Sequence, residues 1–153
     1  MSRNKKVNEG EKGKRETPNK TPRSDPNIQI SDMQKKPTWR IECIDLDGPF
    51  GWKNIERKEF FNFILPKLKE IENKYWSEIS ISGKKYYHQV GIDVISKEAK
   101  NRLRQLQLDE NPKLLSLHLS SKKRIWGIKI GNVIKVLWWD PEHKVYPTQP
   151  RNT

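Results

Sequence analysis

The sequence lacks the features that mark disulfide-linked, secreted or membrane proteins. Its 153 residues include one cysteine, Cys43, which excludes an internal disulfide and a zinc site built from several cysteines. No apolar run approaches the roughly 18 residues that a transmembrane helix needs. The basic N-terminus is not followed by the apolar core of a secretory signal. We therefore expect a cytoplasmic protein in a reducing compartment.

Motifs for nucleotide cofactors and metal catalysis are also missing. The sequence contains no GxGxxG, GxxxxGK[ST], HExxH or CxxC. His88, His118 and His143 are too far apart in sequence to indicate a metal motif. Cys43 has no recognisable catalytic partner and is expected in the core. The sequence predicts neither a cofactor nor a metal.

Acidic residues are in deficit. There are 31 Lys and Arg against 19 Asp and Glu, which gives a net charge of +12. Such an excess favours polyanionic partners, either nucleic acid or acidic protein segments, although part of it can simply aid solubility. Hydrophobic residues make up only 33%, but six Trp, four Tyr and four Phe provide large core side chains. The length suits one domain.

Composition divides the chain near Pro37. Residues 1–37 contain few large apolar side chains, carry ten bases and five acids, and have prolines at 18, 22, 26 and 37. Such a segment cannot bury enough surface to offset its ordering entropy, which predicts a disordered basic tail. We expect a single α+β domain at residues 38–147 and a C-terminal tail at 148–153.

The first half of that domain predicts a strand followed by two helices. From Thr38 an alternating pattern predicts a strand with Trp39, Ile41 and Cys43 inward. A helix capped by Asn54 should run to about Ile79, with a kink at Pro66. After a connector over residues 80–96, Ser96 should cap a shorter helix at residues 97–108. In this helix the side chains of Arg102 and Arg104 are expected to point outward.

The second half predicts a three-stranded antiparallel meander. Apolar alternation marks strands at residues 115–119, 125–130 and 133–139, and Gly131-Asn132 suits a two-residue hairpin. The expected fold is therefore α+β: a strand, two helices and the meander, with the helices against one sheet face. The expected sheet core is Leu115, Leu117, Leu119, Trp126, Ile128, Ile130, Ile134 and Val136.

This order and the basic body resemble the RelE/ParE-type toxins of bacterial toxin–antitoxin systems. The resemblance covers roughly residues 39–147 and is clearest in KKRIWGIKIGNVIKVLWWDPEHKVY. It implies a RelE-like fold, metal-independent cleavage of RNA, free or on the ribosome, and an acidic antitoxin as protein partner. The matching positions are Lys122, Lys123, Arg124, His143 and Tyr146. The long first helix and Trp138-Trp139-Asp140-Pro141 depart from the family pattern.

The chemistry of these residues fits that reaction. Attack of a ribose 2′-OH on phosphorus needs a base, an acid and positive charge. Histidine is the side chain type whose ordinary pKa lies nearest neutrality, so His143 is the candidate acid or base. Arg124 could hold a phosphate through two hydrogen bonds, and Tyr146 could assist or stack on a base. Lys122, Lys123, His118 and Lys135 are candidate substrate contacts.

Each of these residues also has an ordinary structural interpretation. His143 could be a solvated loop residue, Arg124 could pair with an acid, and Tyr146 could be a packing anchor. Trp126, Trp138 and Trp139 could stack bases, although at least two should be core. The Tyr86-Tyr87-His88 cluster could line a groove.

Three classes of function remain open. The first is a toxin-like endoribonuclease. The second is a non-catalytic module that binds nucleic acid or protein through the same basic sheet. The third is a protein of this fold that docks on another enzyme, as the gyrase-directed branch does. The sequence does not predict an oligomeric state.

Overall fold

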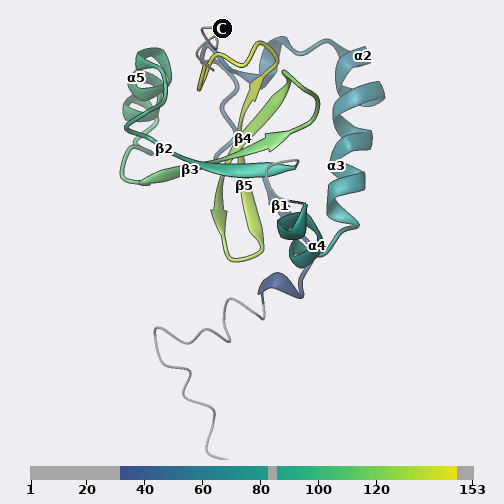
Figure 1. The fold of residues 1–153 in the computed structure, drawn as a ribbon. Coiled ribbons are helices and arrows are strands. Elements are labelled where there is room, and N and C mark those ends of the chain that lie inside the picture. The colour runs from purple at the N-terminus through teal and green to yellow at the C-terminus, as the bar shows by residue number, and fades with distance from the viewer. Residues whose placement is uncertain (1–31, 83–85, 148–153) are drawn as a thin grey trace, which may run out of the picture.

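A five-stranded mixed sheet organises the chain (Figure 1). The computed structural model describes residues 32–82 and 86–147. The strands follow the order β1-β5-β4-β3-β2, with β1 parallel to β5 and the other pairs antiparallel. Their bounds are β1 Thr38–Arg40, β2 Tyr87–Gly91, β3 Lys113–His118, β4 Arg124–Ile130 and β5 Val133–Asp140. Residues 1–31 of the N-terminal tail expected at 1–37, and the tail expected at 148–153, lie outside the described residues.

The predicted meander is confirmed as β3, β4 and β5. The β4–β5 hairpin turns at Gly131, whose φ of 60° suits glycine, and pairs Ile130 with Val133. A β-bulge between Trp126 and Gly127 shifts the register of this pair. The α+β class and the order of strand, helices and meander are confirmed as well.

The first helical region has more interruptions than the single kinked helix predicted from Asn54 to about Ile79. A short 3-10 turn, η1, covers Trp52–Asn54, and a continuous helix follows, made of α2 Arg57–Glu59, the π-turn η2 Phe60–Ile64 and α3 Leu65–Glu72. The chain breaks before α4, Trp76–Ile81. The irregularity expected at Pro66 takes the form of the π-turn. The prediction of Asn54 as the N-cap is wrong, because Glu56 occupies the N-cap position of α2.

The helices cover both sheet faces, so the expectation of a single covered face is wrong. Helix α5, Lys97–Gln105, packs on one face through Ala99 and Leu103. The segments η2, α3 and α4 pack on the other face through Ile64, Ile71 and Ile79, respectively. The two layers lie on opposite sides of the sheet in Figure 1. The cap of α5 is as predicted, because Ser96 Oγ accepts a hydrogen bond from Ala99 N at 3.2 Å.

Several local expectations are wrong. The connector at 80–96 contains the edge strand β2. Strand β1 ends at Arg40, so Ile41 is 72% exposed and Cys43 lies half-buried outside any strand. Ile130, expected in the core, is 57% exposed at the end of β4. Residues 32–37 already contact the body, since Trp76 N donates to Lys35 O and Pro37 is buried.

Candidate acid–base site at one end of the sheet

A row of polar side chains crosses one end of the sheet. Register places His118 opposite Arg124, and Arg124 opposite Asp140. Residues directly opposite in antiparallel strands project to the same face. His88 pairs with Ser116, two positions from His118, and so belongs to this face too. The sheet therefore brings together residues from four strands, β2, β3, β4 and β5.

Two of the three histidines are hydrogen-bonded to each other. His88 Nδ1 lies 2.8 Å from His118 Nε2, with the rings nearly perpendicular and their centroids 4.8 Å apart. The Tyr146 ring centroid is 6.5 Å from that of His88, and Tyr146 is partly buried against the α5-side core. Paired imidazoles can pass a proton between them, so this pair is an acid–base unit that either histidine alone would not provide.

Arg124 is anchored in the β3–β4 turn. Its side chain donates to the backbone carbonyls of Ser120, Ser121 and Lys123, and the residue is only 8% exposed. Burial lowers the pKa of the guanidinium, and the nearby Asp140 carboxylate partly offsets this effect. Within the described part of the chain, its buried Nε has no hydrogen-bond partner. The arginine therefore holds the turn, and its charge lies beneath the site rather than projecting into solvent.

His143 lies in a loop that Asp140 organises. The buried Asp140 carboxylate accepts hydrogen bonds from Lys144 N at 2.8 Å, Val145 N at 2.9 Å and Trp126 Nε1 at 3.2 Å. His143 itself has a φ of 57°, an unfavourable backbone conformation for a residue other than glycine. Its Nδ1 is buried without a hydrogen-bond partner among residues 32–82 and 86–147. The loop thus holds His143 in a strained, defined position.

Two pockets flank Arg124. One, of about 480 Å³, is lined by His118, Tyr86 and Arg124 among others. The second, of about 350 Å³, is lined by Arg124, His143 and Lys122 among others. His118 and His143 therefore line separate pockets that share Arg124 and Ser121. We call His88, His118, Arg124 and His143 the sheet-end site.

The candidate lysines do not all join this site. Lys122 Nζ lies 2.6 Å from Glu142 and lines the His143 pocket. The adjacent Lys123 pairs with Glu59 of α2. Lys135 is five positions along β5 from Asp140 and pairs with Glu42 at 2.8 Å, so the structure places it away from the others.

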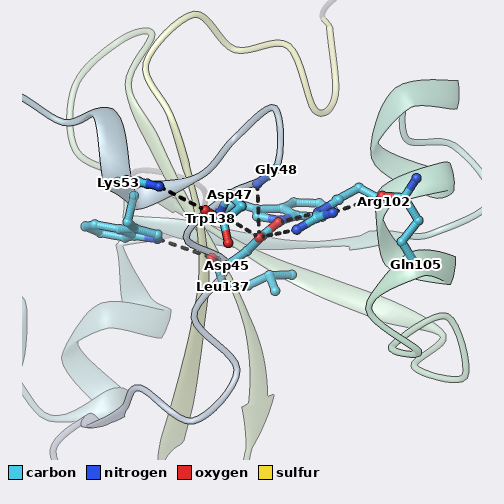
Figure 2. Close-up of polar contacts among 9 residues, drawn as sticks. Asp45, Asp47, Gly48, Lys53, Arg102, Gln105, Leu137 and Trp138 are labelled. Atoms are coloured by element: carbon cyan, nitrogen blue, oxygen red, sulfur yellow. Dashed lines mark hydrogen bonds and ion pairs between the residues drawn. The ribbon is translucent and has the colours of Figure 1, made fainter.

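The tryptophans are not available as stacking platforms. Trp126 and Trp138 are fully buried, and Trp139 is 6% exposed. Trp138 Nε1 donates to Asp45 Oδ2 at 2.9 Å, in a cluster where Arg102 also contacts Asp45 at 2.8 and 2.7 Å (Figure 2). The expectation that Arg102 points outward is therefore wrong, because a buried carboxylate attracts it inward.

Sequence reasoning undervalued two parts of the site. His88 was predicted only as part of a groove-lining cluster in a connector, and Asp140 was noted only within the segment Trp138-Trp139-Asp140-Pro141. The aromatic and β-branched residues Tyr86, Tyr87 and Val90, bounded by Gly83 and Gly91, were the signal for a strand, and a strand there would have brought His88 into the sheet. The anchoring of Arg124 had no sequence signal, because carbonyl acceptors are present in every turn.

No family model, curated protein or solved structure matches the chain. The resemblance to RelE/ParE-type toxins therefore stays a prediction. Across the described ranges, no group of three His, Cys, Asp or Glu side chains is placed to hold a metal ion. No helix in the same ranges is long and apolar enough to cross a membrane.

Proposed function

We propose that this protein cleaves RNA at the sheet-end site by metal-independent transesterification. The observation that carries the proposal is the arrangement of the histidines: His88 and His118 form a hydrogen-bonded pair, and His143 lines a second pocket that shares Arg124 with the His118 pocket. A cytoplasmic location, RNA free or on the ribosome, and an acidic antitoxin as partner belong to the same proposal. The element order that resembles RelE/ParE-type toxins supports it.

The reaction needs two proton transfers on opposite sides of a phosphate. A base removes the proton of the ribose 2′-OH, the 2′ oxygen bonds to phosphorus, and the bond from phosphorus to the 5′ oxygen breaks. An acid returns a proton to that 5′ oxygen, which leaves a 2′,3′-cyclic phosphate. His118 and His143, in the two pockets that share Arg124, suit these two roles, with His88 able to relay a proton to or from His118.

Arg124 and the loop around it have supporting roles in this proposal. The guanidinium is held by three carbonyls, so it provides positive charge beneath the phosphate rather than a flexible grip. Lys122 at the rim can reach the phosphate if it leaves Glu142. Tyr146 packs beside His88 and positions that ring.

A non-catalytic RNA-binding module is the second candidate. It is favoured by the engagement of the cationic groups: Arg124 is bonded to the backbone, and Lys122 and Lys123 are paired with glutamates. Under this alternative the same end of the sheet would hold RNA without cutting it.

A cleavage assay in excess EDTA separates the two candidates. Wild type, His118→Asn and His143→Asn are incubated with single-stranded RNA and with mRNA on ribosomes, and 2′,3′-cyclic phosphate ends are measured. We expect each substitution to slow cleavage by about 10²- to 10⁴-fold, the usual contribution of an acid or base. Binding of a 2′-O-methyl oligonucleotide, which cannot react, should stay within a few-fold of wild type.

The control is Gln89→Asn, an exposed position next to His88 whose side chain projects to the opposite face. It should cleave at the wild-type rate. Wild type that binds RNA but cuts neither substrate would establish the binding module. Cleavage that persists unchanged in both histidine variants would also refute the assignment.

A further inference from the structure

An exposed aromatic ring lies on the outer side of the α2–η2 helix. Phe61 is 52% exposed, whereas its neighbours Phe60 and Phe63 pack against the core. The spacing of Phe61 with Ile64 and Leu68 predicts that Phe61 is buried as well, together with Phe60 and Phe63. Single exposed apolar side chains are common on protein surfaces, so the groups around Phe61 decide whether it has a role.

The π-turn explains why this ring faces outward. Pro66 has no N–H and its ring crowds the carbonyl four residues earlier, which disfavours an ordinary α-turn. Leu65 N instead donates to Phe60 O, five residues back. The wider turn changes the angular offset between Phe61 and the buried Ile64, so Phe61 leaves the core-facing side. Phe60 takes the inward position.

The surroundings of Phe61 are cationic. Arg57, Lys58 and Asn62 line a shallow pocket of about 480 Å³ together with Phe61, and none of these four described residues is acidic. Arg57 Cζ lies 5.7 Å from the Phe61 ring centroid. A flat ring beside two cations and an amide matches the chemistry of a nucleotide, whose base stacks and whose phosphate is anionic. We call these four residues the Phe61 patch.

This patch is connected to the sheet-end site. Glu59, between Lys58 and the π-turn, pairs with Lys123 of the β3–β4 turn. The same Lys123 ammonium lies 4.4 Å from the Phe63 ring centroid. Lys123 directly precedes Arg124, so the helix carrying the patch is fastened to the turn that carries the site.

We infer that the Phe61 patch binds an unpaired base and its phosphate in single-stranded RNA, outside the sheet-end site. The inference rests on the proposed function for the identity of the polymer. Arg57 and Lys58 would contact the backbone, and Phe61 would stack on one base. Single-stranded RNA is favoured over duplex because bases inside a helix do not expose their faces.

A second exposed aromatic ring provides a matched control. Tyr75 is 46% exposed and lies below Lys36 Nζ at 5.4 Å, so it also combines a ring with a cation. It precedes α4, at the opposite end of the long helix from α2 (Figure 1). A general effect of removing an exposed ring should appear at both positions, whereas an RNA contact should appear at Phe61 alone.

The test is the affinity of the full-length protein for a non-cleavable 2′-O-methyl single-stranded oligonucleotide, measured by fluorescence anisotropy. Phe61→Leu should weaken binding by roughly 5- to 150-fold, the loss of one stacked base. Phe61→Trp should bind at least as tightly as wild type, and Tyr75→Leu should match wild type. Thermal melting of each variant confirms that the fold is retained.

Several outcomes would overturn the inference. These are wild-type affinity in Phe61→Leu, an equal loss in Tyr75→Leu, equally tight binding of duplex RNA, or no RNA binding by wild type. Phe61-dependent capture of an acidic peptide without RNA binding would identify a protein docking surface instead. If Phe61→Leu loses affinity while wild type cuts no RNA, the patch stands and the proposed cleavage fails. If histidine-dependent cleavage occurs and Phe61→Leu binds normally, only the patch fails.

Discussion

Two buried carboxylates on the same sheet face differ in how they are neutralised. Trp126 and Trp138 are cross-strand partners, and each indole donates to a different aspartate, Asp140 and Asp45 respectively. Asp45 also accepts two hydrogen bonds from Arg102 of α5 (Figure 2). Asp140 instead accepts from two loop amides, while Arg124 opposite it donates to carbonyls.

The difference separates a structural cluster from a candidate active site. At Asp45 the ion pair is complete, so the cluster fixes α5 and the loop after β1 to the sheet. Around Asp140 the charges are not directly paired, and in the described structure Arg124 Nε and His143 Nδ1 are buried without hydrogen-bond partners. Unsatisfied polar groups are costly, and natural proteins concentrate such costs at functional sites.

The largest effect should come from breaking the cluster of Asp45, Arg102 and Trp138. Arg102→Met leaves the Asp45 carboxylate buried without its cation, which typically costs about 3–5 kcal/mol of unfolding free energy. We expect a value near the lower end, because 20% of the Arg102 side chain is exposed. Urea unfolding measures it. Arg104→Met on the same helix, where the arginine is exposed and contacts Asn101, should change stability little.

The double variant Asp45→Asn, Arg102→Met sharpens this result. Removing both charges should recover part of the loss, since the unpaired carboxylate causes most of it. If Arg102→Met alone costs less than about 1 kcal/mol, the pair is no stronger than an ordinary surface pair.

Changes around Asp140 should alter both the stability of the fold and the rate of RNA cleavage. Asp140→Ala leaves the Trp126 indole and two loop amides without their acceptor, at a cost of about 1–3 kcal/mol. It should also lower RNA cleavage, because the loop no longer holds His143. The measurements are urea unfolding and the EDTA cleavage assay. A stable variant with normal cleavage would show that Asp140 does not position His143.

Acid should weaken the cluster of Asp45, Arg102 and Trp138 by protonating the Asp45 carboxylate. Burial favours the neutral carboxyl, but hydrogen bonds from Arg102, Trp138 and Gly48 outweigh it and hold the pKa of Asp45 below its ordinary value of 3.8. A lowered folded-state pKa stabilises the fold at neutral pH, and this contribution is lost as pH falls below 3.8 and through the folded value. Unfolding free energy measured from pH 6 to pH 2 should therefore fall less steeply in Asp45→Asn than in wild type. Parallel curves would contradict this account.

The smallest effect should come from the exposed pair at the rim. Glu142→Gln frees Lys122, and the loss of one exposed ion pair should change stability by less than about 1 kcal/mol. RNA binding should become modestly tighter, and the gain should shrink as salt is raised. Asp47→Asn, which breaks the similarly exposed pair with Lys53, is the control and should leave RNA binding unchanged. Weaker binding in Glu142→Gln would mean that the carboxylate itself contributes to the site.

Sequence patterning predicted the elements that depend on local signals. The meander, the Gly131-Asn132 hairpin and the Ser96 cap follow from period-two alternation, glycine tolerance of positive φ and side-chain capping. The disruption at Pro66 was predictable because proline lacks an N–H. Its form, a π-turn that moves Phe61 outward, was not predictable, since it depends on how the flanking turns pack.

By itself, the sequence determined the α+β class, the order of elements, the basic charge and the set of residues able to do chemistry. Only the tertiary structure decided which of those residues meet. The pairing of β2 with β3 joined His88 to His118, and the loop fixed by Asp140 placed His143 in a pocket that Arg124 also lines. Local patterns arise from neighbours in sequence, whereas charge pairing and burial depend on contacts between segments tens of residues apart. That is why Arg102 turned inward to Asp45, a residue from the loop after β1.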